Sequence, residues 1–218
     1  MASSVATAPS RPELDPDLLA KISPVTLAEH KVLPVPEAVR SLFPQGGLQQ
    51  GSTLAVTGRG RWSLAMAVLA EALGDEGWVA MVGVPDLNLA AAAEFGVRLD
   101  RVLVVEDPGP GRWATVVATL LESVEVVAVA PTAPVGRRDL RRLSARTREQ
   151  GGVLLHLDGA RHWPEAPDLR LEVVTDTWQG LGDGHGVLAG RRVTVRADGR
   201  RIRGGGRSVS VWLPGPDG

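Results

Sequence analysis

The stretch that decides the fold is residues 51–64, GSTLAVTGRGRWSL. Residues 52–56 form a short apolar run typical of a buried strand, and the glycines after it favour a tight turn. Residues 62–73 are apolar on almost every side, as in a helix buried on most of its faces. A strand, a glycine turn and a buried helix together form the layout of a phosphate-binding loop, in which backbone N–H groups hold an anion.

The side chains of a working phosphate loop are missing from this stretch. Such a loop reads G-x-x-x-x-G-K-[ST], with a lysine for the outer phosphates and a hydroxyl for magnesium. Counted from Gly58, the second glycine, the lysine and the hydroxyl residue of this pattern would fall on Ser63, Leu64 and Ala65. A shortened loop would instead consist of Gly58, Gly60, Arg61 and Ser63. We interpret it as a vestigial phosphate loop; the alternative is a purely structural turn.

The rest of the chain alternates strands and helices before its character changes. We predict helices over 36–43, 62–73, 87–95, 113–123 and 136–149, and strands over 52–56, 78–82, 101–105, 124–129 and 153–157. Three further strands, over 169–178, 186–195 and 208–213, follow without helices between them. Continuous apolar strands separated by helices indicate a parallel sheet covered on both faces. The predicted fold is therefore α/β, with a mostly parallel central sheet flanked by helices and an antiparallel C-terminal extension.

Composition divides the chain into three parts. We expect an N-terminal segment over 1–30, partly disordered with a short helix over 13–22, then one domain over 31–213 and a disordered tail over 214–218. The sequence holds no apolar run long enough to span a membrane, and its start does not read as a secretory signal. The chain also has no cysteine, which excludes disulfides and thiolate metal sites. We expect a cytoplasmic protein.

Charge is distributed unevenly although the net charge is only −1. Residues 1–130 hold 9 basic and 15 acidic side chains, whereas residues 131–218 hold 15 and 10. All 15 basic residues of the second part are arginines. Such asymmetry can mark an acidic or nucleic-acid partner.

Two groups of arginines are candidates for contacting a partner. The first lies on the predicted helix 136–149, where residues four apart share a face: Arg138, Arg142 and Arg146. The second lies in the C-terminal part among glycines: Arg191, Arg192, Arg200, Arg201 and Arg203. Arginine groups of this kind bind phosphates or acidic surfaces. The alternative for both groups is an ordinary solvated surface.

Residues 46–58, GGLQQGSTLAVTG, resemble the start of the ATPase core of RecA-family recombinases, which also begins with GGL, a short turn, a glycine and a strand. The resemblance continues through residues 93–103, AEFGVRLDRVL, and more weakly through 124–131 and 153–158. It implies a RecA-like fold. In this register Ala130 lies where RecA has its magnesium-binding Asp. The water-activating Glu would fall among Gly83, Val84 and Pro85, with Asp86 displaced from that position.

The chain thus lacks the lysine, the aspartate and the glutamate on which phosphoryl transfer depends. We therefore expect neither enzymatic activity nor a cofactor. The enzymatic alternative is a divergent nucleotide-binding protein that hydrolyses its nucleotide with Arg61, Ser63 and Asp86. We also expect no metal site, because His156, Asp158 and His162 form too small a ligand group.

Short, degenerate RecA-like chains of this kind are similar to the ImuA-type accessory proteins of DNA-damage mutagenesis in high-GC bacteria. The resemblance implies a non-catalytic role in an inducible complex for translesion DNA synthesis, within the SOS response. It implies as partners an ImuB-type inactive Y-family polymerase and an error-prone C-family polymerase, with DNA as a further contact and association with the nucleoid after damage. A SulA-like inhibitor of cell division shares the same core and is the regulatory alternative.

Overall fold

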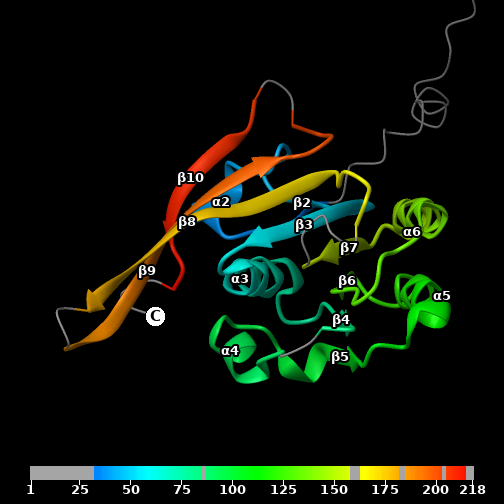
Figure 1. Cartoon of the computed structure of the whole chain (residues 1–218), viewed down its shortest axis with the longest axis horizontal. Helices are drawn as coiled ribbons and strands as arrows, with labels where there is room; N and C mark the ends of the chain where they lie inside the picture. Colours follow the sequence, from blue (N-terminus) through cyan, green and yellow to red (C-terminus); the bar gives the residue numbers. More distant parts are fainter. Residues whose placement is uncertain (1–31, 85–86, 158–162, 182–184, 203–204, 215–218) are drawn as a thin grey trace, which may run out of the picture. The chain divides into compact units, whose positions relative to one another are not determined.

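The computed structural model describes residues 32–84, 87–157, 163–181, 185–202 and 205–214. Within these ranges eight strands form one sheet in the order β10-β9-β8-β3-β7-β6-β4-β5 (Figure 1). Their bounds are β3 (Ser52–Gly58), β4 (Val79–Val82), β5 (Val102–Val105), β6 (Val126–Val129), β7 (Val153–His156), β8 (Leu169–Leu181), β9 (Gly186–Asp198) and β10 (Arg207–Trp212). Strands β8, β3, β7, β6, β4 and β5 are mutually parallel, and β9 and β10 add antiparallel. This confirms the predicted fold class.

The helices cover both faces of the parallel part. Their bounds are α2 (Glu37–Arg40), α3 (Arg61–Leu73), α4 (Leu89–Glu94), the short 3-10 helix η1 (Leu99–Arg101), α5 (Pro110–Leu120) and α6 (Arg137–Gln150). Alternate residues of one strand face opposite layers: Met81 packs in the cluster that contains α3, whereas Ala80 packs in the cluster that contains α5 and α6. Both faces of the strand are therefore buried, which explains its continuous apolar run.

The sequence analysis missed a small sheet before β3. β1 (Val32–Leu33) pairs antiparallel with β2 (Leu48–Gln49), two segments for which the sequence analysis predicts no strand. Two-residue strands carry no periodicity, so sequence patterns do not reveal them. The pairing depends on Gly47, because a Cβ atom added there would overlap the side chain of Val32 and lie 2.6 Å from the carbonyl oxygen of Leu33.

The hairpin of β8 and β9 is longer than predicted. Each strand has 13 residues, and their far halves reach beyond the helical layers as an arm (Figure 1, lower left). A bulge lies between Val173 and Thr175, and Trp178 pairs with Arg191 on the neighbouring strand. The arm exposes apolar side chains that the core cannot reach: Val174, Trp178, Val187 and Leu188.

A polar link joins the starts of β3 and β8. The backbone N–H and the hydroxyl of Thr53 donate to Asp168 Oδ2 at 2.9 and 3.1 Å, and the Asp168 N–H donates back to the Thr53 hydroxyl at 2.9 Å. Arg200 and Arg201 approach Asp168 Oδ1 at 3.1 and 3.4 Å. Burial raises the pKa of Asp168, but the Thr53 donors and the two arginines outweigh this effect, so the pKa lies below its usual value.

The predicted helix over 13–22 and the predicted disordered segments at both ends lie largely outside the described residues. Among the helices of the described ranges, none is long and apolar enough to cross a membrane.

Candidate functional site

The strand–turn–helix unit forms as predicted. β3 ends at Gly58 with φ 89°, and Gly60, with φ 80°, is the N-cap of α3. A Cβ atom at Gly58 would overlap the carbonyl oxygen of Val173 on β8, so only glycine fits there. The left-handed backbone at both positions also favours glycine. The loop therefore keeps the backbone shape that its sequence indicated.

Arg61, Trp62 and Ser63 are half-buried but do not assemble a phosphate site of the usual kind. Arg61 begins α3, its guanidinium lies 6.0 Å from the centre of the Trp62 ring, and its buried Nε has no hydrogen-bond partner in the described part of the chain. Ser63 follows within the first turn. No acidic residue lies in the first turn of α3. The start of the helix thus keeps a positive potential.

Arg191 of β9 fills the space over the loop. A Cβ atom added at Gly60 would lie 2.5 Å from Cζ of Arg191 and overlap its terminal nitrogens, so the guanidinium lies directly on the Gly60 backbone. The Arg191 side chain is only 8% exposed. It donates to Asp176 Oδ2 at 2.8 Å, and its Cζ lies 5.4 Å from the centre of the Trp178 ring.

The ion pair with Asp176 explains how a buried arginine is tolerated beside the start of α3. A cation at a helix N-terminus is electrostatically unfavourable, and the Asp176 carboxylate offsets that cost by pairing with Arg191. Nε of Arg191 is buried and has no hydrogen-bond partner within the described ranges. The base of the β8–β9 arm is thereby held to the start of α3 through Arg191, Asp176 and Gly60.

Two positions that the RecA register assigned to carboxylates lie at or near the ends of strands. Ala130 directly follows β6, as the sequence predicted. Asp86 lies outside the described residues. After β5, Asp107 accepts hydrogen bonds from the hydroxyl of Thr132 and from the N–H of Gly109, and these bonds lower its pKa. Asp107 therefore serves to join two loops.

The candidate arginines on α6 occupy different surroundings. Arg138 and Arg142 are exposed, whereas Arg146 pairs with Glu149 and with Glu122, in the turn that follows α5. Leu140, Leu143, Ser144 and Thr147 form the buried stripe. Arg146 lies beside this stripe and reaches that turn, so the three residues do not act as one exposed face.

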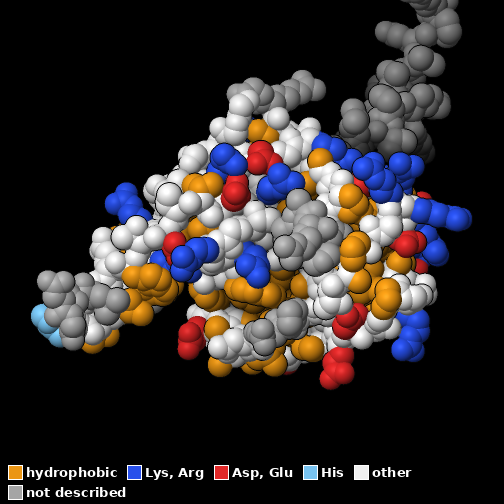
Figure 2. Space-filling model, in the orientation of Figure 1, with side chains coloured by type: hydrophobic (Ala, Val, Ile, Leu, Met, Phe, Trp, Pro, Cys, Tyr) orange, Lys and Arg blue, Asp and Glu red, His pale blue; other side chains and the backbone are white. Residues whose placement is uncertain are grey.

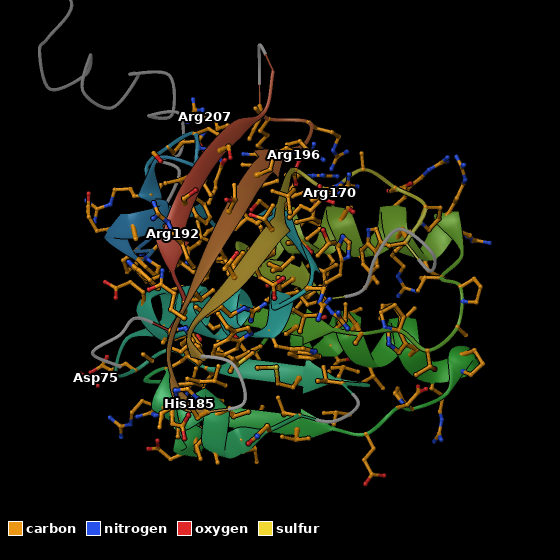
Figure 3. All side chains as sticks on the ribbon, turned by 60° about the vertical axis from the view of Figure 1, so that its left-hand side comes forward. Asp75, Arg170, His185, Arg192, Arg196 and Arg207 are labelled. Atoms are coloured by element: carbon orange, nitrogen blue, oxygen red, sulfur yellow. The ribbon has the colours of Figure 1, made fainter. Side chains whose placement is uncertain are left out.

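The C-terminal candidates also separate into two kinds. Arg191 is buried, and Arg200 and Arg201 pair with Asp168, so these three side chains hold the fold together. Arg192 is exposed on the outer side of β9 (Figure 3). Arg203 lies outside the described residues. Whether the exposed members contact a partner stays a prediction.

Sequence reasoning missed Asp176 and Asp168, the acidic partners of these arginines. Each is a single acidic residue far along the chain from the groups that it binds, and no spacing rule joins them. It also passed over a second arginine row on α6: Arg137, Arg141 and Arg148. Their spacing of four and seven residues was a usable signal, because such residues share a helix face.

Metal binding finds no support among the residues that the structure describes, since no three His, Asp or Glu side chains there could hold an ion together. Asp158 and His162 lie outside those residues. His156 is buried, and Trp163 stacks on it with ring centres 4.6 Å apart.

Comparison with known proteins gives one family and one relative. The model of the MT3502 N-terminal domain family matches residues 41–165, more than half of the chain. The uncharacterized protein Rv3395c of Mycobacterium tuberculosis is 32% identical over 136 residues, a stretch that covers 62% of this chain and 66% of that protein, just under two thirds of its length. The region that the family model matches includes the loop between β3 and α3 and the helix α6, and it ends before β8. The chain belongs to the MT3502 N-terminal domain family.

Proposed function

We propose that this chain is a non-catalytic accessory protein of an inducible complex for translesion DNA synthesis, in which it binds an inactive Y-family-like polymerase subunit. The observation that carries the proposal is the Arg191 guanidinium on the backbone of Gly60. It takes the volume in which a phosphate would approach the start of α3. The RecA-like resemblance of residues 46–58 and 93–103 supplies the link to DNA-damage proteins.

The loop chemistry supports a role without catalysis. Phosphoryl transfer depends on a lysine, a magnesium ion and a group that orients water. Arg61 stands near the lysine position, yet its side chain lies against Trp62. Ala130 directly follows β6, at the position where the RecA resemblance would require a magnesium-binding Asp. A chain with these loop residues would act by binding other proteins.

The exposed arginines supply part of such a surface. Arg138, Arg142 and Arg192 are exposed and form no ion pair among the described residues. Arginine is one of the residue types that contribute most to protein–protein binding energy. Arg191, Arg200 and Arg201 have structural partners instead, so a test of binding should leave these three unchanged.

The proposed location is the cytoplasm, with association to the nucleoid after DNA damage. A fluorescent fusion tests this directly, because the fusion should move from a diffuse distribution to the nucleoid within the response to damage. A distribution unchanged by damage would contradict this part of the proposal.

The experiment that tests the function is a tagged pull-down from DNA-damaged cells, read by mass spectrometry. We expect a Y-family-like subunit together with an error-prone C-family polymerase. The variants Arg192→Ala and Arg138→Ala/Arg142→Ala test the exposed arginines in the same assay, and an unchanged recovery with both would remove them from the interface. Recovery of a division protein, or of no polymerase, would overturn the proposed function in favour of a regulatory role.

A further inference from the structure

A groove of about 460 Å³ runs beside α6, away from the phosphate-type loop. It is lined by Arg137, Arg141, Ser144 and Arg148 of α6, by residues 164–166, and by Arg200 from the turn after β9. Figure 2 shows arginines gathered over the position of α6, at the right of the view. The groove thus lies between one row of side chains on α6 and the turn that follows β9.

The charge of this groove is only partly compensated. Arg200 pairs with Asp168 at 3.1 Å, and Arg141 lies 3.6 Å from Glu165 with 73% of its side chain exposed. Arg137 and Arg148 are exposed and form no ion pair in the described part of the chain. The groove therefore keeps a surplus of positive charge.

The groove on the other side of α6 differs in this respect. It is lined by Arg142 and Arg146 but also by Glu122 and Glu149, and Arg146 pairs with both acids. Its described lining holds as many acidic as basic side chains. The described lining of the groove with Arg137, Arg141 and Arg148 holds four arginines against one glutamate, so it carries the larger positive charge of the two.

The cations form a line. Arg137 and Arg148 are eleven residues apart on one helix, which corresponds to a rise of about 16 Å. Arg141 lies between them, and Arg200 adds to the same groove. Guanidinium groups bind phosphate oxygens through two parallel hydrogen bonds, so a row of arginines fits a chain of phosphates.

The lining also argues against a protein segment as the occupant. Protein interfaces place aromatic or large apolar side chains at their centre. The described lining holds only arginines, a serine, a proline, a glutamate and an alanine. Without aromatic rings it offers no platform on which bases could stack. The groove can therefore bind a charged backbone but cannot distinguish one base from another.

We propose that this groove binds the sugar–phosphate backbone of a nucleic-acid strand without sequence preference. The proposed function requires only protein partners, so this assignment goes beyond it. Binding of this kind is weakened by salt, because each neutralised phosphate releases a counterion. Arg137, Arg141 and Arg148 contribute a salt slope of about −2, at about −0.7 for each contact with a single strand.

The test uses the purified full chain and a labelled oligothymidine of about 16 nucleotides, with fluorescence anisotropy measured between about 50 and 200 mM salt. The groove variant is R141A/R148A. The matched control is R112A/R207A, which removes the same charge from exposed positions outside both grooves. Circular dichroism establishes that both variants fold. A duplex of the same length shows whether the strand must be single, and polyglutamate serves as an acidic polymer without phosphate.

We expect R141A/R148A to weaken binding at least about tenfold and to reduce the salt slope by about 1.4, which corresponds to two lost contacts. The control should change affinity less than about twofold. Equal weakening in both variants would overturn the assignment, because it would show a general charge effect. Binding of polyglutamate in place of the oligonucleotide would overturn it in favour of an acidic protein. These outcomes do not depend on the polymerase partners, so failure here leaves the proposed function separately testable.

Discussion

The guanidinium carbon of Arg191 lies where a side chain at Gly60 would have to begin: a Cβ atom there would be 2.5 Å from Arg191 Cζ. The two residues are far apart in the sequence, on β9 and at the N-cap of α3. Their contact holds the β8–β9 hairpin to the loop between β3 and α3. It also places a cation of the protein itself at the positive end of a helix.

Gly60→Ala should destabilise the chain more than Gly151→Ala does. Both glycines have a left-handed backbone, with φ 80° and 71°, but nothing lies within 4 Å of a Cβ added at Gly151. The left-handed backbone alone costs about 1 to 2 kcal/mol, so the excess at Gly60 measures the overlap with Arg191. Urea unfolding gives both values. If Gly60→Ala costs no more than Gly151→Ala, the close contact with Arg191 is wrong.

Arg191→Ala should lower the free energy of unfolding by about 2 to 3 kcal/mol, because it leaves the mostly buried Asp176 carboxylate without its partner. The neighbouring Arg192→Ala, at an exposed position, should change it by less than about 0.5 kcal/mol. Thermal and urea unfolding of the two variants test this. Equal effects would show that Arg191 is as dispensable as its neighbour.

The free energy of unfolding should fall in acid, because Asp168 becomes protonated there. The pKa of Asp168 is lower in the folded chain than the ordinary carboxyl value of about 4. Its contribution to the free energy of unfolding is therefore fully present above about pH 4 and is lost as the pH falls from there through the lowered pKa of the folded chain. Melting temperatures measured between pH 7 and pH 2 check this. The variant Asp168→Asn, which cannot ionise, should lose stability at pH 7 and show a flatter pH dependence. A variant curve parallel to that of the wild type would contradict the assignment.

Trp163→Ala should cost about 3 to 5 kcal/mol, the usual range for a buried tryptophan. Trp163 is 4% exposed, stacks on His156, and meets Trp113 edge-on with ring centres 6.4 Å apart. Trp212→Ala, at a side chain that is 38% exposed, is the control and should cost far less. Chemical denaturation of both proteins decides the matter, and similar costs would show that Trp163 is not part of the core.

Much of the fold could be predicted from the sequence because the parallel strands are buried on both faces. The run that became β6 is continuously apolar, and Gly151 ends α6 where the sequence placed its end. The helix α5 begins at Pro110, three residues before the predicted start. Proline favours the first position of a helix, but the first three residues of α5 add nothing to its apolar spacing, so hydrophobic periodicity did not reveal them. Boundaries of this kind depend on capping geometry rather than on hydrophobic spacing.

Less of the site could be predicted, because its contacts join distant parts of the chain. The glycines of the loop were found, since their backbone role is local. The occupant of the loop was not found: Arg191 read as one member of an exposed arginine group, and only the register of β8 with β9 turns it toward Gly60. In the same way, Thr53 gave no sign that it would bind Asp168, 115 residues later.

The most direct test of the central claim, that Arg191 takes the place of a nucleotide in this loop, is calorimetric titration of magnesium ATP into the purified wild-type chain. We predict no saturable binding at concentrations up to about 1 mM, which corresponds to a binding free energy weaker than about −4 kcal/mol. Saturable binding of one nucleotide per chain with a dissociation constant near 1 μM, about −8 kcal/mol, would contradict the claim.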